Sequence, residues 1–210
     1  MNIEDNIINI KNTAPKARLI VVTKHQTIDC VKKVYEFGER EFGENKVQEI
    51  LRKKSQLPND IKWHMIGHLQ KNKVKLIAPF IHMIQSVDSI ELLKLINTQA
   101  KNHNRKIKCL IQYKMSKEQT KYGFNKESVT KLFESDLIEE FKNIEISGIM
   151  GMASFSTDTN QIKVEFKDIY NIFSSLNMKS KILSIGMSND YKIAYQYSST
   201  MIRIGSAIFK

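Results

Sequence analysis

Apolar positions along the chain fall into two alternating kinds of segment. Between several short apolar runs, apolar residues recur every three or four positions, as on one face of a helix. These stripes are clearest within 28–35, 92–100 and 166–173. The short runs are rich in β-branched residues, which is typical of buried strands. They occupy residues 19–23, 40–42, 61–66, 82–87, 107–113, 144–150, 181–185 and 201–204.

Strands that alternate with helices predict βαβ units and a parallel sheet, and therefore an α/β fold. Eight units of roughly 25 residues each would fill the chain, which favours a single (β/α)8 barrel of the TIM type. A doubly wound open sheet is the competing architecture, and periodicity alone does not separate the two. An opening helix is expected at 3–12, and helix starts are expected at Ser89 and Asn125. Without a linker or low-complexity tract, residues 1–210 are expected to form one domain.

Composition and the few special residues indicate a protein of the cytoplasm. Apolar residues make up 41% of the chain and charged residues 26%, which is ordinary for a globular protein. The polar start of the chain does not resemble a signal peptide, and no apolar run reaches the ~18 residues of a membrane span. Cys30 and Cys109 have no near partner in the sequence, so reduced thiols are expected.

The formal charge of +11 raises the question of nucleic-acid binding. The basic residues are 28 Lys and 5 Arg, and the lysines are spread along the whole chain. Nucleic-acid sites usually cluster basic residues with aromatic ones. The dispersed pattern therefore predicts a solvated surface, with steering of a small anionic ligand as a further effect. A basic nucleic-acid-binding module is the weaker alternative, and a salt-dependent binding titration would separate the two.

Residues with useful chemistry follow the predicted strands. Lys24 comes directly after the first strand, where a partly desolvated amine can act as a nucleophile. Arg203, Gly205 and Ser206 lie at the tip of the last strand, where backbone N–H groups and a hydroxyl suit a phosphate. Glycines also recur at these strand ends, although the chain has only eight. If both ends meet at one rim of a barrel, they predict a pocket for a phosphorylated aldehyde, and pyridoxal phosphate is the obvious candidate.

Each of these residues also has a simpler interpretation. Most lysines after strands are merely solvated. Ser188 lacks the second glycine of a G-x-S-x-G nucleophile motif, so a phosphate-binding turn fits it better. His64 and His68 are four residues apart, but the strand-like 63–66 and Gly67 argue against one helical face. No Glu or Cys completes a metal set there, so no metal is expected and His64 is interpreted as a hydrogen-bonded core or rim residue.

Further motifs run in order along the chain. They are VVTK at 21–24, FGENKVQE at 42–49, WHMIGHLQ at 63–70 with Asn72-Lys73, QSVDS at 85–89, KYGF at 121–124, GIMG at 148–151, LSIGMSND at 183–190 and STMIRIGSAIF at 199–209. Together they resemble the YggS/PROSC family of pyridoxal-phosphate homeostasis proteins. The resemblance covers nearly the whole chain.

The resemblance implies a type III pyridoxal-phosphate barrel, similar to the barrel of alanine racemase but without its second β-domain. It implies that Lys24 forms a Schiff base with pyridoxal 5'-phosphate and that Asn45 lines the ring pocket. Arg203 would face the pyridine nitrogen. The phosphate would be held by Ser188, Gly205 and Ser206.

The function implied is storage or delivery of pyridoxal 5'-phosphate in vitamin B6 homeostasis, by a monomer without catalytic turnover. An arginine at the ring nitrogen leaves that nitrogen unprotonated, so the ring is a poor electron sink. Partners would be the cofactor and, transiently, apo forms of pyridoxal-phosphate enzymes, with no nucleic acid or membrane. The alternative is a racemase or decarboxylase using the same cofactor. Such relatives add a β-domain, for which this chain lacks the length.

Four positions depart from the family pattern. Ser198 stands where the family usually has Gly, which is expected to stiffen that turn. His25 replaces a common Thr, Lys46 a usual Tyr, and Ser206 a frequent Thr. None of these departures removes a residue assigned to the cofactor.

Overall fold

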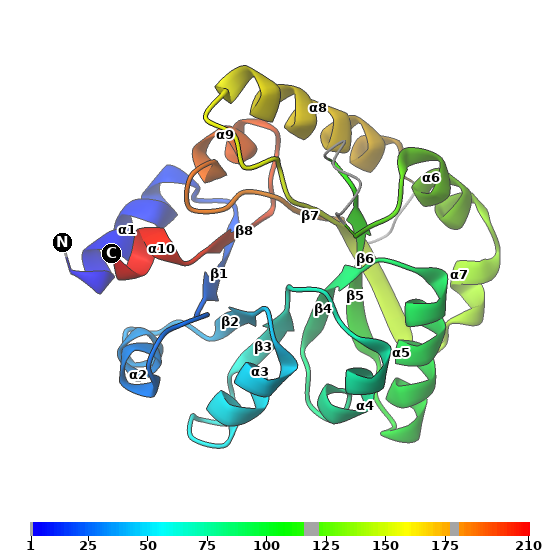
Figure 1. Cartoon of the computed structure of the whole chain (residues 1–210), viewed down its shortest axis with the longest axis horizontal. Helices are drawn as coiled ribbons and strands as arrows, with labels where there is room; N and C mark the ends of the chain where they lie inside the picture. The colour runs from blue at the N-terminus through cyan, green and yellow to red at the C-terminus, as the bar shows by residue number, and fades with distance from the viewer. Residues whose placement is uncertain (1, 116–121, 177–180) are drawn as a thin grey trace.

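Eight parallel strands form a closed barrel in the computed structural model, which describes residues 2–115, 122–176 and 181–210. The strands follow one another around the barrel in sequence order, and β1 pairs with both β2 and β8 (Figure 1). This closure excludes the open doubly wound sheet and confirms the predicted barrel. The strands are β1 Arg18–Val22, β2 Glu41–Glu44, β3 Lys62–Met65, β4 Met83–Val87, β5 Ile107–Tyr113, β6 Ile144–Gly151, β7 Ile182–Ser184 and β8 Met201–Ile204.

Helices surround the barrel, and the predicted helix starts are confirmed. Ser89 accepts a hydrogen bond from the Leu92 amide, and Asn125 accepts one from the Ser128 amide, as N-caps do. The first helix packs beside the last, next to both chain ends (Figure 1). The helices are α1 Ile3–Thr13, α2 Ile28–Glu36, α3 Val47–Lys54, η1 Lys71–Lys73, α4 Val74–Ile77, α5 Ile90–Asn102, α6 Lys126–Glu134, α7 Leu137–Glu140, α8 Thr159–Ser175, α9 Tyr191–Gln196 and α10 Ser206–Phe209.

The apolar core has two layers, because successive side chains of a strand point to opposite faces. The larger layer lies between the barrel wall and the helices, and includes the tilted rings of Phe42 and Trp63. The smaller layer fills the inside of the barrel. It consists of Ile20, Met83, Leu110, Met150 and Met201, with Met152 and Ile182 packed against it. A barrel filled in this way has no open channel, so ligands are confined to its ends.

The ends of the strands differ slightly from those expected. Strand β2 continues to Glu44, two residues beyond the predicted run. Gly43 is therefore inside a strand, and Asn45 is the first residue after it. Among the described residues, no helix is both long and apolar enough to cross a membrane.

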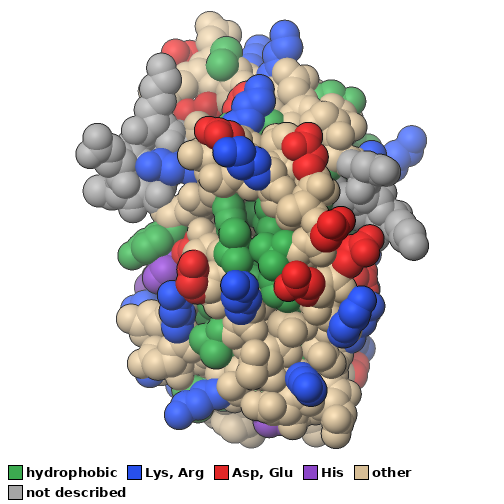
Figure 2. Space-filling view, turned by 90° about the vertical axis from the view of Figure 1, so that its right-hand side faces the viewer, with side chains coloured by type: hydrophobic (Ala, Val, Ile, Leu, Met, Phe, Trp, Pro, Cys, Tyr) green, Lys and Arg blue, Asp and Glu red, His purple; other side chains and the backbone are tan. Residues whose placement is uncertain are grey.

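Charged side chains of both signs share the surface in Figure 2, which views the side of the barrel covered by α5, α6 and α7. Lys and Arg side chains are interspersed with Asp and Glu there, around a central apolar strip. On this face the excess positive charge does not form the continuous basic surface that nucleic-acid binding needs.

Candidate functional site

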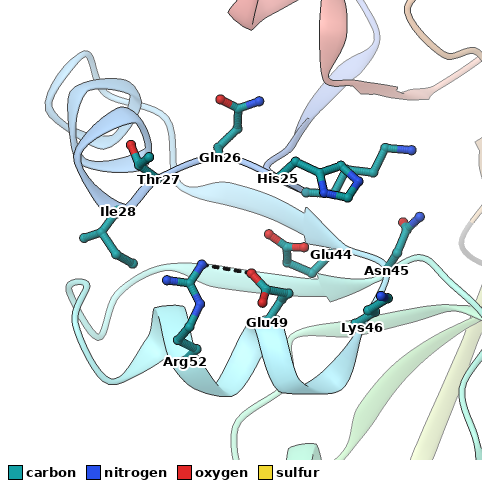
Figure 3. A pocket seen from close by; sticks show the side chains of 10 residues that line it. His25, Gln26, Thr27, Ile28, Glu44, Asn45, Lys46, Glu49 and Arg52 are labelled. Atoms are coloured by element: carbon teal, nitrogen blue, oxygen red, sulfur yellow. Dashed lines mark hydrogen bonds and ion pairs between the residues drawn. The ribbon is translucent and has the colours of Figure 1, made fainter.

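The carboxyl ends of β1 and β2 border a pocket of about 510 Å³. Lys24 and Asn45 line it, together with the exposed Lys46 and the Glu49–Arg52 ion pair of α3 (Figure 3). Lys24 itself is exposed. The partial desolvation that can activate a lysine at a strand end is not seen here, because the chain leaves the strand after Val22 and turns sharply.

The turn after Lys24 has an unusual backbone conformation. His25 has a φ of 65°, in the left-handed region that non-glycine residues rarely adopt. The backbone therefore turns away from the direction of β1 at His25, and α2 begins three residues later at Ile28. The turn holds Lys24 at the pocket instead of continuing the barrel wall.

A buried ion pair lies directly behind the pocket. Lys53 is completely buried, and its ammonium group contacts a carboxylate oxygen of Glu44. The same ammonium group donates to the Thr23 carbonyl at 2.7 Å, and the Thr23 hydroxyl donates to Glu44 at 2.6 Å. The other oxygen of Glu44 is buried without a hydrogen-bond partner among the described residues. Sequence reasoning missed this pair, since nothing in a lysine-rich helix marks one lysine as buried.

The turn after β7 gathers amide groups on one oxygen atom. The Ser188 hydroxyl accepts hydrogen bonds from the backbone N–H groups of Gly205, at 3.3 Å, and Ala207, at 3.2 Å. Asp190 holds the turn, because its carboxylate accepts the Met187 amide at 2.5 Å. Burial raises the pKa of Asp190 despite that bond and the nearby Arg203 charge. Two N–H groups that converge on one oxygen form the kind of arrangement that holds an anion.

Gly205 joins this turn to the end of β1. A Cβ atom on Gly205 would lie 3.0 Å from the Val22 carbonyl oxygen, so any other residue would force the two backbones apart by a few tenths of an ångström. The pairing of β8 with β1 brings the two strands together along their length. The structure therefore gathers the predicted site residues at one rim, with Lys24 and Asn45 beside the pocket and Ser188, Gly205 and Ser206 at the neighbouring turn.

Arg203 lies inside the barrel, just below that rim. It is 3% exposed and donates to the Ser184 carbonyl at 2.8 Å, the Ser184 hydroxyl at 2.6 Å and the Gly151 carbonyl at 2.9 Å. Burial lowers the pKa of its guanidinium to about 10, while the negative charge of Asp190 works in the opposite direction. The group is therefore still a cation at neutral pH, fixed in place by three acceptors.

A chain of hydrogen bonds continues from Arg203 through the barrel interior. The Ser184 hydroxyl contacts the Gln85 carboxamide oxygen at 2.7 Å, and the Gln85 nitrogen contacts His64 Nδ1 at 3.0 Å. His64 is completely buried. The interpretation of His64 as a hydrogen-bonded core residue is thus confirmed, whereas His68 lies at the rim, where it contacts Asp88 at 2.8 Å and stacks on Tyr122. Lys121 lies outside the described residues.

Tyr113 is the last residue of β5, and a tyrosine at a strand end could serve as an acid or base. It belongs to β5 and packs in the core layer between the barrel and the helices. Its hydroxyl donates to Asp168 at 2.5 Å, and burial together with this bond raises the pKa of the phenol. Tyr113 is therefore part of the barrel wall.

The fold and the rim define a class of barrels in which a lysine follows the first strand, and backbone amides that follow the eighth strand converge on a serine that follows the seventh. A sequence profile of the family described as "Alanine racemase, N-terminal domain" matches residues 1–210. Among curated proteins, the human pyridoxal phosphate homeostasis protein is 37% identical over 93% of this chain and 77% of its own length. The protein of the same name from Synechocystis is 32% identical over 95% of this chain and 94% of its own length. The chain belongs to the family of pyridoxal phosphate homeostasis proteins.

Solved structures agree with this assignment. PipY of Synechococcus elongatus, solved without pyridoxal phosphate, is 26% identical to this chain. The superposition covers 100% of both chains and has a TM-score of 0.94. The same protein with pyridoxal phosphate bound gives a TM-score of 0.87. An alanine racemase of Clostridium difficile is 16% identical, and its superposition has a TM-score of 0.77. That superposition covers 99% of this chain and 56% of the racemase chain. That likeness supports the barrel fold alone.

Proposed function

We propose that this protein binds pyridoxal 5'-phosphate at the carboxyl rim of its barrel and stores it or delivers it to other proteins, as a part of vitamin B6 homeostasis. The observation that carries the proposal is the convergence of the Gly205 and Ala207 amides on Ser188, next to the pocket that holds Lys24. The names of the curated relatives and the cofactor-bound form of PipY support it.

The residues present fit this cofactor. When bound, it supplies an aldehyde that reacts with primary amines and a phosphate dianion that needs several donors. Lys24 offers an exposed amine at the pocket, and Asn45 lines the space beside it. Ser188, Gly205 and Ser206 would hold the phosphate, each charge-assisted bond contributing about 1.5–3 kcal/mol.

Arg203 would face the pyridine nitrogen. Its guanidinium remains a cation with donors only, so it would leave that nitrogen without a proton. Proton abstraction from an amino acid requires a strong electron sink or a base on each face of the cofactor. Tyr113 is not free to act as such a base, because its hydroxyl is committed to Asp168. We therefore propose that the protein has no appreciable turnover of amino acids.

A transfer experiment tests this function. Protein loaded with the cofactor and desalted should restore activity to an apo pyridoxal-phosphate enzyme, while incubation with alanine, serine, lysine or ornithine should give no racemisation or decarboxylation above free cofactor. Loss of all cofactor during desalting would contradict the carrier role. Inversion or decarboxylation of any one amino acid, lost in Lys24→Ala, would instead support the enzyme alternative. A monomeric state, a cytoplasmic location and a single domain over 1–210 stay predictions.

A further inference from the structure

Three potential metal ligands meet at the end of the barrel opposite the Lys24 rim. Glu41 opens β2, His64 lies within β3, and His82 directly precedes β4. One ligand atom of each lies within 4.8 Å of the other two. No acidic partner stands near His64 in the sequence, because the neighbouring strands β2 and β4 supply the partners.

Two atoms of this cluster are buried without a hydrogen bond among the described residues. They are His64 Nε2 and one carboxylate oxygen of Glu41, 3.5 Å apart. A buried polar atom without a partner destabilises the folded protein, so such atoms call for a specific explanation. The His64 ring is completely buried, and its centroid lies 5.3 Å from that of His82. Its unpartnered nitrogen therefore faces the interior of the cluster and not solvent.

We propose that Glu41, His64 and His82 bind a divalent first-row transition-metal ion of the zinc class, with water completing its coordination. Two imidazoles and one carboxylate are a frequent ligand set for such ions, whereas Mg²⁺ and Ca²⁺ prefer oxygen ligands alone. Burial lowers the pKa of both histidines, that of His82 to about 4 with the help of its neighbour His64. Both rings are then neutral at pH 7, as metal ligands must be.

The surroundings of His64 complete the site. A histidine that binds metal through Nε2 normally donates its Nδ1 proton to an acceptor that fixes the ring. Gln85 contacts Nδ1 at 3.0 Å and can turn its carboxamide so that the oxygen accepts this proton. In the present orientation the Ser184 hydroxyl donates to the Gln85 oxygen. After the turn, the Gln85 NH₂ group would donate to the Ser184 hydroxyl oxygen instead. Metal binding therefore requires one defined amide orientation.

Two cations oppose the ion. Arg18 and Lys62 lie 3.8 and 3.7 Å from the Glu41 carboxylate, and about half of each side chain is exposed. They can turn toward solvent as the ion enters, but their charges weaken its binding. Removing one of them should therefore strengthen binding, which a purely structural role of the cluster would not predict.

The experiment uses the full-length protein, treated with a chelator and desalted, and titrated with Co²⁺ followed by Zn²⁺. We expect one Co²⁺ per chain, a visible absorption band, and displacement by Zn²⁺. His82→Asn and Glu41→Gln should weaken Co²⁺ binding at least tenfold, and Lys62→Gln should strengthen it several-fold. His82 is only half-buried, so its variant should fold, and circular dichroism and retention of bound pyridoxal phosphate check this.

Two exposed histidines supply matched controls. His103→Asn, at the end of α5, and His68→Asn, at the rim, should leave the Co²⁺ titration unchanged. Absence of a cobalt band at millimolar Co²⁺ would overturn the proposal. So would a band that persists in both His82→Asn and Glu41→Gln, or one that disappears in His68→Asn.

Discussion

Two lysines near the end of β1 occupy opposite environments. Lys24 is exposed at a pocket, beside a turn in a left-handed conformation. Lys53 comes from α3, is completely buried and contacts both Glu44 and the carbonyl of Thr23, the residue directly before Lys24. One amine is available to a ligand, while the other has all its contacts inside the protein.

The difference shows how the barrel separates binding from support. A buried ammonium group is tolerated only with a partner charge and further hydrogen bonds, and Lys53 has both. By anchoring Glu44 and Thr23, it fixes the ends of β1 and β2 from which Lys24 and Asn45 project. The reactive amine can then remain exposed on a rigid base.

Removing the buried ammonium group should have the largest effect. Lys53→Met leaves the Glu44 carboxylate buried without its partner, which should lower the free energy of unfolding by about 3–5 kcal/mol. Lys24→Met removes the same charge at an exposed position and should change it by less than about 0.5 kcal/mol. Urea denaturation measures both. Equal losses in the two variants would remove the distinction between the two environments.

Variants at the exposed rim should change the affinity for the ligand more than they change the free energy of unfolding. Ser188→Ala removes the hydroxyl that gathers two amides, so affinity for pyridoxal phosphate should fall by about 1–3 kcal/mol. Gly205→Ala should have a similar effect, because its Cβ would press on the Val22 carbonyl. A fluorescence titration with pyridoxal, which lacks the phosphate, is the control. Equal losses for both ligands would show that these residues do not contact the phosphate.

The half-buried imidazole of His82 should make the protein sensitive to acid. The pKa of His82 is lowered to about 4 in the folded state by burial and by the neighbouring His64. Between pH 6.5 and 4 the unfolded chain therefore binds more protons, and the free energy of unfolding should fall as the pH falls through this window. Because His82 is half-exposed, the expected loss is only about 1–2 kcal/mol. Urea denaturation in the presence of chelator should show a shallower pH dependence for His82→Asn, and an unchanged slope would contradict this origin.

The smallest effect concerns the turn before β8. Ser198 has a φ of 60°, where the family usually has glycine. Glycine relieves the backbone strain, which costs about 1–2 kcal/mol. It also makes the unfolded chain more flexible, which lowers stability by about 0.4–1 kcal/mol. The net effect of Ser198→Gly should be a stabilisation of about 0.5–1 kcal/mol. Ser198→Ala keeps the Cβ atom and should bring no gain. Thermal denaturation compares the two, and equal melting temperatures would contradict strain at this turn.

The barrel could be predicted from the sequence because each strand is a short apolar run with a clear end. All eight predicted runs overlap observed strands, and the boundary error at β2 arose because Gly43 was interpreted as a turn residue. The strand-end residues could be found because parallel strands place their carboxyl ends at one rim.

Contacts made across the fold could not be predicted in this way. The burial of Lys53 depends on how α3 packs, and the grouping of Glu41 with His82 depends on strand register. Ser198 is an intermediate case, since its departure from the family pattern pointed to a stiff turn that the backbone angle now explains.

The site itself is tested most directly by locating the lysine that binds the cofactor. The protein is loaded with pyridoxal phosphate, reduced with borohydride, digested and mapped by mass spectrometry. We predict modification at Lys24, loss of that modification in Lys24→Ala, and no change in Lys46→Ala, which lines the same pocket. The assignment of Lys24 would be contradicted if the Lys24→Ala protein were modified on Lys46, or on any other lysine, to the same extent as the protein that retains Lys24.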